Sequence, residues 1–293
     1  MIHRYQKKGL NFVLDVNSGA VHLLDDISYA VSGLLDENMG DTCPQSIIDA
    51  LPDYTADEIR EAYDELYELL RHEREHGKIV WVMGPAFAFD HDARNAFSLL
   101  VAGGYVHALL AGNALATHDL EAAYLKTALG QNIYTQESQP NGHYNHLDTI
   151  NRARYHGSIA AFIRNEKIDD GIIYQCETHH VPYVLAGSIR DDGPLPGVIG
   201  DAYEAQDRMR EQVRDATTII CMASMLHTIA TGNMTPTYRV LKDGTVRQVY
   251  FYCVDIAEFV VNKLTDRGSL AARGIVTNVQ DFIVTLTKGL GLQ

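Results

Sequence analysis

One segment of the chain, from Val181 to Pro196, carries the densest group of residues that could do chemistry. An apolar run that ends at Ala186 is followed by small and charged residues: Gly187, Ser188, Arg190, Asp191 and Asp192. A buried strand that ends in such residues is how an open α/β sheet builds a ligand crevice at its carboxyl edge. Two other interpretations remain, a capped turn and a structural ion pair between Arg190 and Asp191.

A second group is rich in histidine and contains His118, Asp119, His143 and His146. These residue types can bind zinc, but only a single i, i+3 pair has ligand-like spacing and no cysteine joins it. We therefore expect no metal, and interpret these histidines as hydrogen-bonded loop residues or as acid–base groups near a substrate. A Schiff-base lysine is a further alternative, but no spacing favours Lys126 or Lys263.

Small or acidic residues recur where the apolar runs end. Gly84, Gly112, Ala223 and Asp255 each follow such a run. Small residues let a flat ligand approach the backbone, and helix N-termini at that edge favour phosphate. Asp255 could accept hydrogen bonds from ribose hydroxyls, or cap the next helix. The G-x-G-x-x-G pattern of dinucleotide-binding proteins is absent, so an ordinary Rossmann fingerprint is excluded.

These residues need a scaffold, and the apolar pattern from Lys78 onward predicts one. We expect strands at Ile79–Met83, His107–Leu110, Gly171–Gln175, Pro182–Leu185, Thr217–Met222, Val249–Val254 and Gly274–Thr277. Helical spacing lies between them, for example over Asp90–Val101 and Ala202–Val213. This alternation predicts an α/β fold with a doubly wound, mostly parallel, Rossmann-like sheet. The turn at Asp243 and Gly244 predicts one antiparallel excursion.

The first 76 residues have a different character. Phe12–Val16 and Ala20–Leu24 predict a hairpin across the turn at 17–19, and helices are expected over Pro44–Ala50 and from Thr55 to Leu70. A small hairpin with helices suggests a winged-helix-like module. We place the domain boundary at the charged cluster from Arg71 to Lys78, with one domain at 1–76 and the other at 78–293.

Composition limits the class of protein. The 293 residues carry a net charge of −14, which argues against nucleic acid or an anionic membrane as the main partner. No apolar run approaches the length of a membrane span, and no signal segment opens the chain. The four cysteines form no C-x-x-C pair and are typical of a reduced, cytoplasmic protein.

Several segments together resemble the archaeal-type, NAD-dependent ornithine cyclodeaminases. The same domain forms the C-terminal part of bifunctional arginine dihydrolase/ornithine cyclodeaminases, and the family is related to lysine-ketoglutarate reductase/saccharopine dehydrogenase proteins. The segments are Leu109–Asp119, Asn141–His146, Val181–Pro196, Ser224–Asn233, Cys253–Asp255, Lys263–Gly268 and Gly274–Val279. The resemblance covers about residues 78–293. It implies conversion of L-ornithine to L-proline and ammonia by an ammonia-lyase of arginine and proline metabolism, with NAD as cofactor and no net redox change.

The resemblance also implies a set of site residues. Those facing NAD would be Asn113, Ala114, Asp192, Ser224, Met225, Leu226, His227, Asp255, Asn278 and Val279. Threonine is expected in place of Ser224 and aspartate in place of Asn278. For catalysis we expect Arg190 to clamp the substrate carboxylate, and Asp119 or Asp191 to hold an ammonium and accept its proton before the hydride leaves. His146 is expected to be a further acid–base group.

The N-terminus resembles another family, the leader-peptide-recognition domain of thioether-forming radical peptide maturases, on Met1–Tyr5, Gly9–Asn11 and Val13–His22. No C-x-x-x-C-x-x-C cluster motif follows. The resemblance implies a peptide partner for this module, which stands where the cyclodeaminases have a longer and different segment. We also expect a homo-oligomer. Two other functions stay open: an NAD-dependent amino-acid or imine dehydrogenase, and a non-catalytic protein that binds a nucleotide and a peptide.

Overall fold

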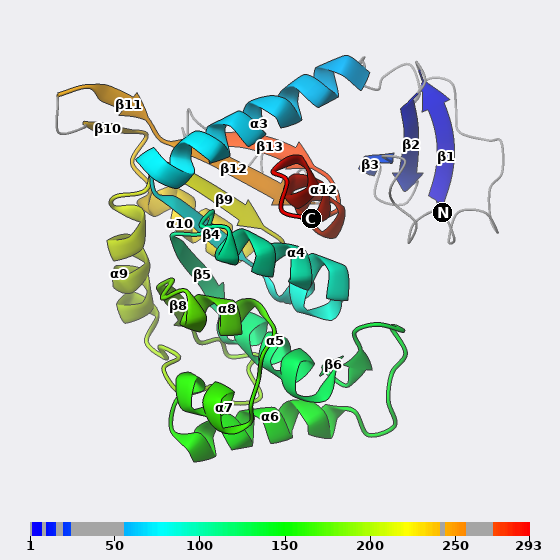
Figure 1. Ribbon diagram of the computed structural model, residues 1–293, viewed down its shortest axis with the longest axis vertical. Helices are drawn as coiled ribbons and strands as arrows, with labels where there is room; N and C mark the ends of the chain where they lie inside the picture. Colours follow the sequence, from blue (N-terminus) through cyan, green and yellow to red (C-terminus); the bar gives the residue numbers. More distant parts are fainter. Residues whose placement is uncertain (1, 8–9, 16–19, 25–55, 241–243, 256–271) are drawn as a thin grey trace.

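A six-stranded, fully parallel sheet forms the centre of the computed structural model (Figure 1). The structure describes the chain except for residues 1, 8–9, 16–19, 25–55, 241–243 and 256–271. The strand order is β13-β12-β9-β4-β5-β8. The bounds are β4 Ile79–Met83, β5 Ala108–Gly112, β8 Tyr183–Ala186, β9 Thr218–Met222, β12 Tyr250–Asp255 and β13 Ala272–Val276.

The path of the chain through this sheet reverses once. The chain enters at β4, continues through β5 and β8 on one side, and then returns to β9, β12 and β13 on the other. Numbered by first appearance, this is the 3-2-1-4-5-6 order of the doubly wound dinucleotide-binding fold. In such sheets a ligand binds outside the carboxyl ends of the strands, where the order reverses. Here that point lies between β4 and β9.

Both faces of the sheet are buried, because the strands are apolar on both sides. On one face Trp81 and Met83 of β4 pack against one set of helices: α3 Ala56–His76, α4 His91–Ala102, α5 Asn113–Leu125, α8 Ile172–Thr178 and α12 Val279–Gly289. On the other face Val80 and Val82 pack toward α9 Ala202–Val213 and α10 Met225–Met234. This helix–sheet–helix layering confirms the predicted fold class.

Short elements complete the described part of the chain. They are the 3-10 helix η1 Pro85–Phe89, the helices α6 His143–His156 and α7 Ile159–Asn165, and the strand pairs β6 Thr127–Ala128 with β7 Gln131–Asn132 and β10 Tyr238–Val240 with β11 Val246–Gln248. The antiparallel β10–β11 pair is the predicted excursion, although residues 241–243 of its turn lie outside the described residues. Among the described helices, none has the length and apolar character needed to cross a membrane.

One predicted strand is wrong. Gly171–Gln175 was expected to be extended, but residues from Ile172 form α8. Gly171 has φ +115°, a conformation that favours glycine, and it starts the helix. The carboxylate of Asp119, 53 residues earlier, accepts hydrogen bonds from the amides of Ile172 and Ile173 and caps α8 from outside the segment. A long-range cap of this kind overrides the β-branched pattern of the local sequence.

The N-terminal region forms a three-stranded antiparallel sheet of β1 Ile2–Lys7, β2 Leu10–Asp15 and β3 Ala20–Leu24. The β2–β3 pairing confirms the predicted hairpin, and β1 was not predicted. The expected helix at Pro44–Ala50 lies outside the described residues, so the winged-helix module stays a prediction.

The predicted domain boundary at residues 76–78 also stays a prediction. Its surroundings are informative, because Leu66 and Leu70 of α3 lie in the same core as the sheet. The buried carboxylate of Glu73 accepts hydrogen bonds from the hydroxyls of Thr217 and Thr218 at the start of β9. The second half of α3 therefore packs as part of the sheet domain.

Candidate functional site

The strand register brings most of the predicted site residues to one edge of the sheet. Met83 pairs with both Ala111 and Met222, and Val254 pairs with Met222, so β5, β4, β9 and β12 end at the same level. Adjacent strands are about 4.8 Å apart, so the three steps from β5 to β12 span about 14 Å. An extended ligand could therefore contact the ends of all four strands at once.

The strand ends approach each other closely where the order reverses. The amide of Gly84, just after β4, donates to the carbonyl of Met222 at 2.9 Å. A β-carbon at position 84 would overlap the carbonyl oxygen of Ala223, so only glycine fits. Ala223 itself has φ +53°, which is uncommon for a residue with a side chain. Strained backbone of this kind is characteristic of functional sites.

The N-terminus of α10 follows directly, and its first residues were predicted to face NAD. Ser224 does not cap the helix, because its hydroxyl pairs with Nδ1 of His227 at 3.0 Å. Burial lowers the pKa of His227 and so favours its neutral form. Met225 and Leu226 are 47% and 78% exposed although both are apolar. This end of α10 thus offers backbone amides and an exposed apolar surface.

At the N-terminus of α5, Asn113 has a different role from the one expected. Its side chain is buried; Nδ2 donates to the carbonyl of Gly193 at 2.9 Å and Oδ1 accepts from the amide of Leu195 at 3.0 Å. The side chain therefore fastens the loop after β8 to α5. No side chain caps α5, so its first backbone amides, including that of Ala114, remain the groups able to meet a phosphate.

The residues expected after the last two strands lie at the same edge. Asp255 ends β12 and pairs in register with Val276. Asn278 caps α12, since its Oδ1 accepts from the amide of Gln280 at 2.8 Å, and Val279 is buried at the start of that helix. The Asn278 side chain is thus engaged in a cap, as an aspartate at that position would be.

The Arg190–Asp192 segment is part of the loop that Asn113 holds. Arg190 and Asp192 are exposed and Asp191 is half-buried. The alternative of an Arg190–Asp191 ion pair finds no support in the described part of the chain. The carboxylate of Asp191 instead accepts from the amide of Ser188 at 2.8 Å, which closes a tight turn. The guanidinium of Arg190 therefore stays at the surface of this loop.

His146 connects this loop with the protein interior. The His146 ring is buried on α6, and its Nε2 lies 3.5 Å from Oδ2 of Asp192. Its Nδ1 lies 3.0 Å from Oε2 of Glu121, a buried residue of α5 that the sequence analysis did not identify. His118 lies beside them, with its ring centre 4.8 Å from that of His146. The predicted histidine group therefore contacts the carboxylate of Glu121 and not that of Asp119, which was the one expected.

The expected carboxylate, Asp119, has surroundings that assign it a structural role. It is fully buried, and its Oδ1 lies 2.6 Å from Nε of Arg94. Its remaining lone pairs accept from the amides of Ile172 and Ile173. A carboxylate that is paired and enclosed in this way cannot hold a substrate ammonium. The expected catalytic role of Asp119 is therefore not supported by the geometry.

Other candidates lie apart from the edge. His143 is exposed and stacks on Tyr144. Lys126 follows α5, and its ammonium is engaged at the surface in an ion pair with Asp170 at 3.4 Å. Lys263 lies outside the described residues. The other alternative, zinc, has a geometric basis, because ligand atoms of His118, Glu121 and His146 lie within 4.8 Å of one another.

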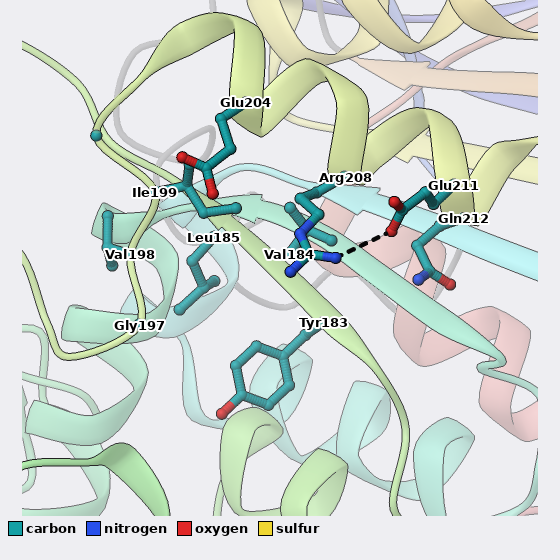
Figure 2. Close-up of a pocket in the computed structure, with 11 residues that line it drawn as sticks. Tyr183, Val184, Leu185, Gly197, Val198, Ile199, Glu204, Arg208, Glu211 and Gln212 are labelled. Carbon is teal, nitrogen blue, oxygen red and sulfur yellow. Dashed lines mark hydrogen bonds and ion pairs between the residues drawn. The ribbon is translucent and has the colours of Figure 1, made fainter.

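A separate hollow lies between β8 and α9 (Figure 2). Tyr183, Val184 and Leu185 line one side of it. Glu204, Arg208 and Glu211 of α9 line the other, and Arg208 pairs with Glu211 at 3.3 Å. None of the predicted site residues lines this hollow. We therefore locate the candidate site at the carboxyl edge of the sheet.

The order of the strands and the placement of the site define a Rossmann-fold protein. More specifically, the chain belongs to the family described as “Arginine dihydrolase ArgZ-like, C-terminal, Rossmann fold”, which matches residues 64–286.

Relatives with known names support this membership. The ornithine cyclodeaminase of Methanopyrus kandleri is 46% identical over 223 residues, which are 76% of this chain and 52% of that protein. The chain thus spans about half the length of the curated archaeal relatives it matches.

Two solved structures are also similar. A conserved LOR/SDH protein from Methanococcus maripaludis has a TM-score of 0.72 at 36% identity, over 96% of this chain and 79% of that one. AgrE, the bifunctional arginine dihydrolase/ornithine cyclodeaminase of Nostoc, solved with ornithine and NAD+, has a TM-score of 0.73 at 38% identity, over 82% of this chain and 34% of that one.

Proposed function

We propose that this protein is an NAD-dependent ornithine cyclodeaminase that converts L-ornithine to L-proline and ammonia. The observation that carries the proposal is the common level of the strand ends, which places two uncapped helix N-termini, Gly84 and Asp255 along one edge of the sheet. The family membership and the complex of AgrE with ornithine and NAD+ support the same assignment.

The residues at this edge fit a dinucleotide. The first amides of α5 and α10 would hold the pyrophosphate, because helix N-termini attract anions. The exposed side chains of Met225 and Leu226 would cover an apolar ring face. Asp255 would accept hydrogen bonds from ribose hydroxyls. NAD, when bound there, supplies the acceptor for the substrate hydride and later returns it, so that the net reaction is not an oxidation.

The loop after β8 would hold the amino acid. Arg190 would clamp the substrate carboxylate with two parallel hydrogen bonds, and Asp191 would hold an ammonium group. Asp192, beside His146, would face the cofactor. Asn113 would keep this loop in place, since it bonds to both Gly193 and Leu195. The division of labour among these side chains is part of the proposal.

The direct test is incubation of the full chain with NAD and L-ornithine, followed by assay of proline and ammonia. Equal amounts of both products without accumulation of NADH are expected, and D-ornithine serves as the control substrate. NADH that accumulates with ornithine or lysine would instead favour an amino-acid or imine dehydrogenase. Absence of any product, with NAD still bound, would favour the non-catalytic binding protein.

We further propose that the chain divides into a peptide-binding N-terminal module and the NAD-binding domain, and that it works as a homo-oligomer in the cytoplasm. The three described cysteines, Cys176, Cys221 and Cys253, are buried and free, which agrees with a reducing compartment. Titration of the full chain with a leader-like peptide tests the module, light scattering tests the assembly, and cell fractionation tests the location.

A further inference from the structure

A line of three polar side chains leads from the protein interior to the candidate site. Glu121 of α5 is fully buried, His146 of α6 lies 3.0 Å from it, and Asp192 lies 3.5 Å beyond, in the loop after β8. Each comes from a different segment, and Asn113 fixes the loop that carries Asp192. The arrangement matches the order of a buried acid, an imidazole and an open site in acid–base catalysis.

The buried carboxylate of Glu121 has hydrogen-bonding partners at both of its oxygens. Its Oε1 accepts from the hydroxyl of Thr127 at 2.7 Å and from the amide of Gly130 at 2.8 Å. Its Oε2 accepts from the amide of Leu129 at 2.9 Å and pairs with His146. Four partners leave the carboxylate no freedom to rotate, so the position of the carboxylate sets the position of the ring.

The ionisation of Glu121 determines which ring nitrogen of His146 carries hydrogen. Burial opposes ionisation, but the imidazoles of His118 and His146, the Gly130 amide and the Thr127 hydroxyl together lower the pKa of Glu121 to about 2. At neutral pH the carboxylate can therefore only accept a hydrogen bond. Nδ1 of His146 must be its donor, and in the neutral ring the lone pair then lies on Nε2.

We propose that Glu121 is a positioning residue, which holds Nδ1–H of His146 so that Nε2, beside Asp192, accepts the proton of the substrate ammonium. The inference rests on the proposed function, since hydride cannot leave until the ammonium is neutral. In this step a nitrogen–hydrogen bond of the ammonium breaks, its electron pair stays on the amine, and a nitrogen–hydrogen bond forms at Nε2. The proton returns to ammonia as it leaves.

Other charged groups near the ring are consistent with this role. His118 and Glu121 face it from α5, and Asp192 faces it from the loop, where Arg154 of α6 also lies close to Gly193. The imidazolium that forms lies between two carboxylates, which stabilise its charge. A metal shared by His118, Glu121 and His146 is the competing interpretation, but each oxygen of Glu121 already has two partners.

The test compares Glu121→Gln with a matched control, Glu166→Gln, which alters a second glutamate that pairs with a histidine of α6. Glu166 pairs with Nε2 of His156 at 2.9 Å, ten residues along α6 from His146, or about 15 Å. For Glu121→Gln we expect kcat for ornithine to fall by at least about 100-fold, because the amide favours the wrong tautomer, with KM changed less than about threefold. Glu166→Gln should leave both unchanged.

The pH profile gives a readout that a purely structural role would not change. Removing a negative charge beside the ring makes its protonation harder, so the acidic limb of kcat/KM should move to lower pH by about one unit in Glu121→Gln. Glu121→Asp keeps the charge, and should restore the acidic limb and part of kcat. A folded Glu121→Gln with wild-type kcat and profile would overturn the inference.

A spectroscopic measurement separates this inference from the proposed function. Nitrogen-15 NMR of the full, histidine-labelled wild-type chain, with His146→Gln to assign the signal, should show hydrogen on Nδ1 of His146. This result is expected even if no proline is formed, in which case only the proposed function fails. A bare Nδ1 with hydrogen on Nε2, or stoichiometric zinc bound through the ring, would overturn the inference while ornithine turnover could persist.

Discussion

Arg94 and Asp119 form a buried ion pair, with Nε of Arg94 2.6 Å from Oδ1 of Asp119 and both side chains at most 3% exposed. The pair joins α4 to α5, and through the amides of Ile172 and Ile173 the same carboxylate also starts α8. Three helices on one face of the sheet therefore depend on a single carboxylate. This explains why an aspartate inside a helix is enclosed so completely.

The first prediction follows from that pair. Asp119→Asn should lower the free energy of unfolding by about 3 kcal/mol, because the buried Arg94 guanidinium loses its closest counter-charge and keeps only Asp170, 3.2 Å from its Nη2. Urea denaturation measures this, with the exposed pair of Arg208 and Glu211 as control. Arg208→Met should change the free energy by less than about 1 kcal/mol. Unchanged stability in Asp119→Asn together with complete loss of activity would restore the catalytic role first expected for Asp119.

A second prediction concerns the loop fastened by Asn113. Asn113→Ala leaves the carbonyl of Gly193 and the amide of Leu195 without partners, at a cost of about 1 to 3 kcal/mol. The loop should then open more often, so hydrogen exchange at Leu195 should speed up by at least about tenfold. Asn165→Ala, which removes a surface contact with His156, is the control. Equal exchange in all three proteins would show that other contacts hold the loop.

The architecture was predictable because its signal is local. The runs of β4, of residues 219–222 in β9 and of residues 251–254 in β12 are apolar and buried on both faces, so they stand out from the helices around them. Asp90 and Asp201 accept hydrogen bonds from the first turns of α4 and α9, and both helices begin within one residue of the predicted start. Periodicity and capping depend on neighbouring residues, which a sequence displays directly.

The site was predicted less completely, because its contacts join distant segments. Glu121 stands among alanines on α5, where a glutamate is normally a solvated helix residue, and His146 is 25 residues away. Asp119 has the residue type of a catalytic acid, and only its partner Arg94 shows that it is structural. α8 was mistaken for a strand for the same reason, since its cap comes from another helix.

The cofactor gives a third prediction, preference for NAD over NADP. A 2′-phosphate ~4 Å from the Asp255 carboxylate would meet repulsion of about 4 kcal/mol at an effective dielectric constant of 20. Solvent at the half-buried Asp255 reduces this value, so we expect at least about tenfold tighter binding of NAD. Calorimetric titration with both cofactors measures the ratio, and Asp255→Asn should reduce it. Equal affinities in the wild-type protein would exclude Asp255 as the ribose ligand.

The histidine cluster gives a fourth prediction, that no zinc is needed. Although ligand atoms of His118, Glu121 and His146 lie near one another, Glu121 is already bonded to Thr127, Leu129 and Gly130. Elemental analysis of the purified chain should therefore find less than stoichiometric zinc, and chelation should leave proline formation unchanged. One tightly held zinc per chain, with activity lost on its removal and regained on its return, would contradict this prediction.

The last prediction separates substrate from cofactor within the loop after β8. Arg190 is exposed, and in the described part of the chain the neighbouring Asp191 carboxylate bonds to the Ser188 amide and forms no ion pair with Arg190. The guanidinium of Arg190 is thus available to clamp the ornithine carboxylate through two parallel hydrogen bonds, a geometry that lysine cannot reproduce. Arg190→Lys should raise KM for ornithine by at least about tenfold and leave the affinity for NAD within about twofold.

Asp192→Ala should have the opposite effect, with weaker binding of NAD and a smaller change in KM for ornithine, because Asp192 is expected to face the cofactor. Both side chains lie at the surface, so neither change should shift Tm by more than a few degrees. Calorimetry with NAD, steady-state kinetics with ornithine and thermal unfolding of both variants distinguish the roles. If instead each variant lost stability and weakened both ligands alike, the segment would be a structural turn, and the substrate clamp would have to lie elsewhere.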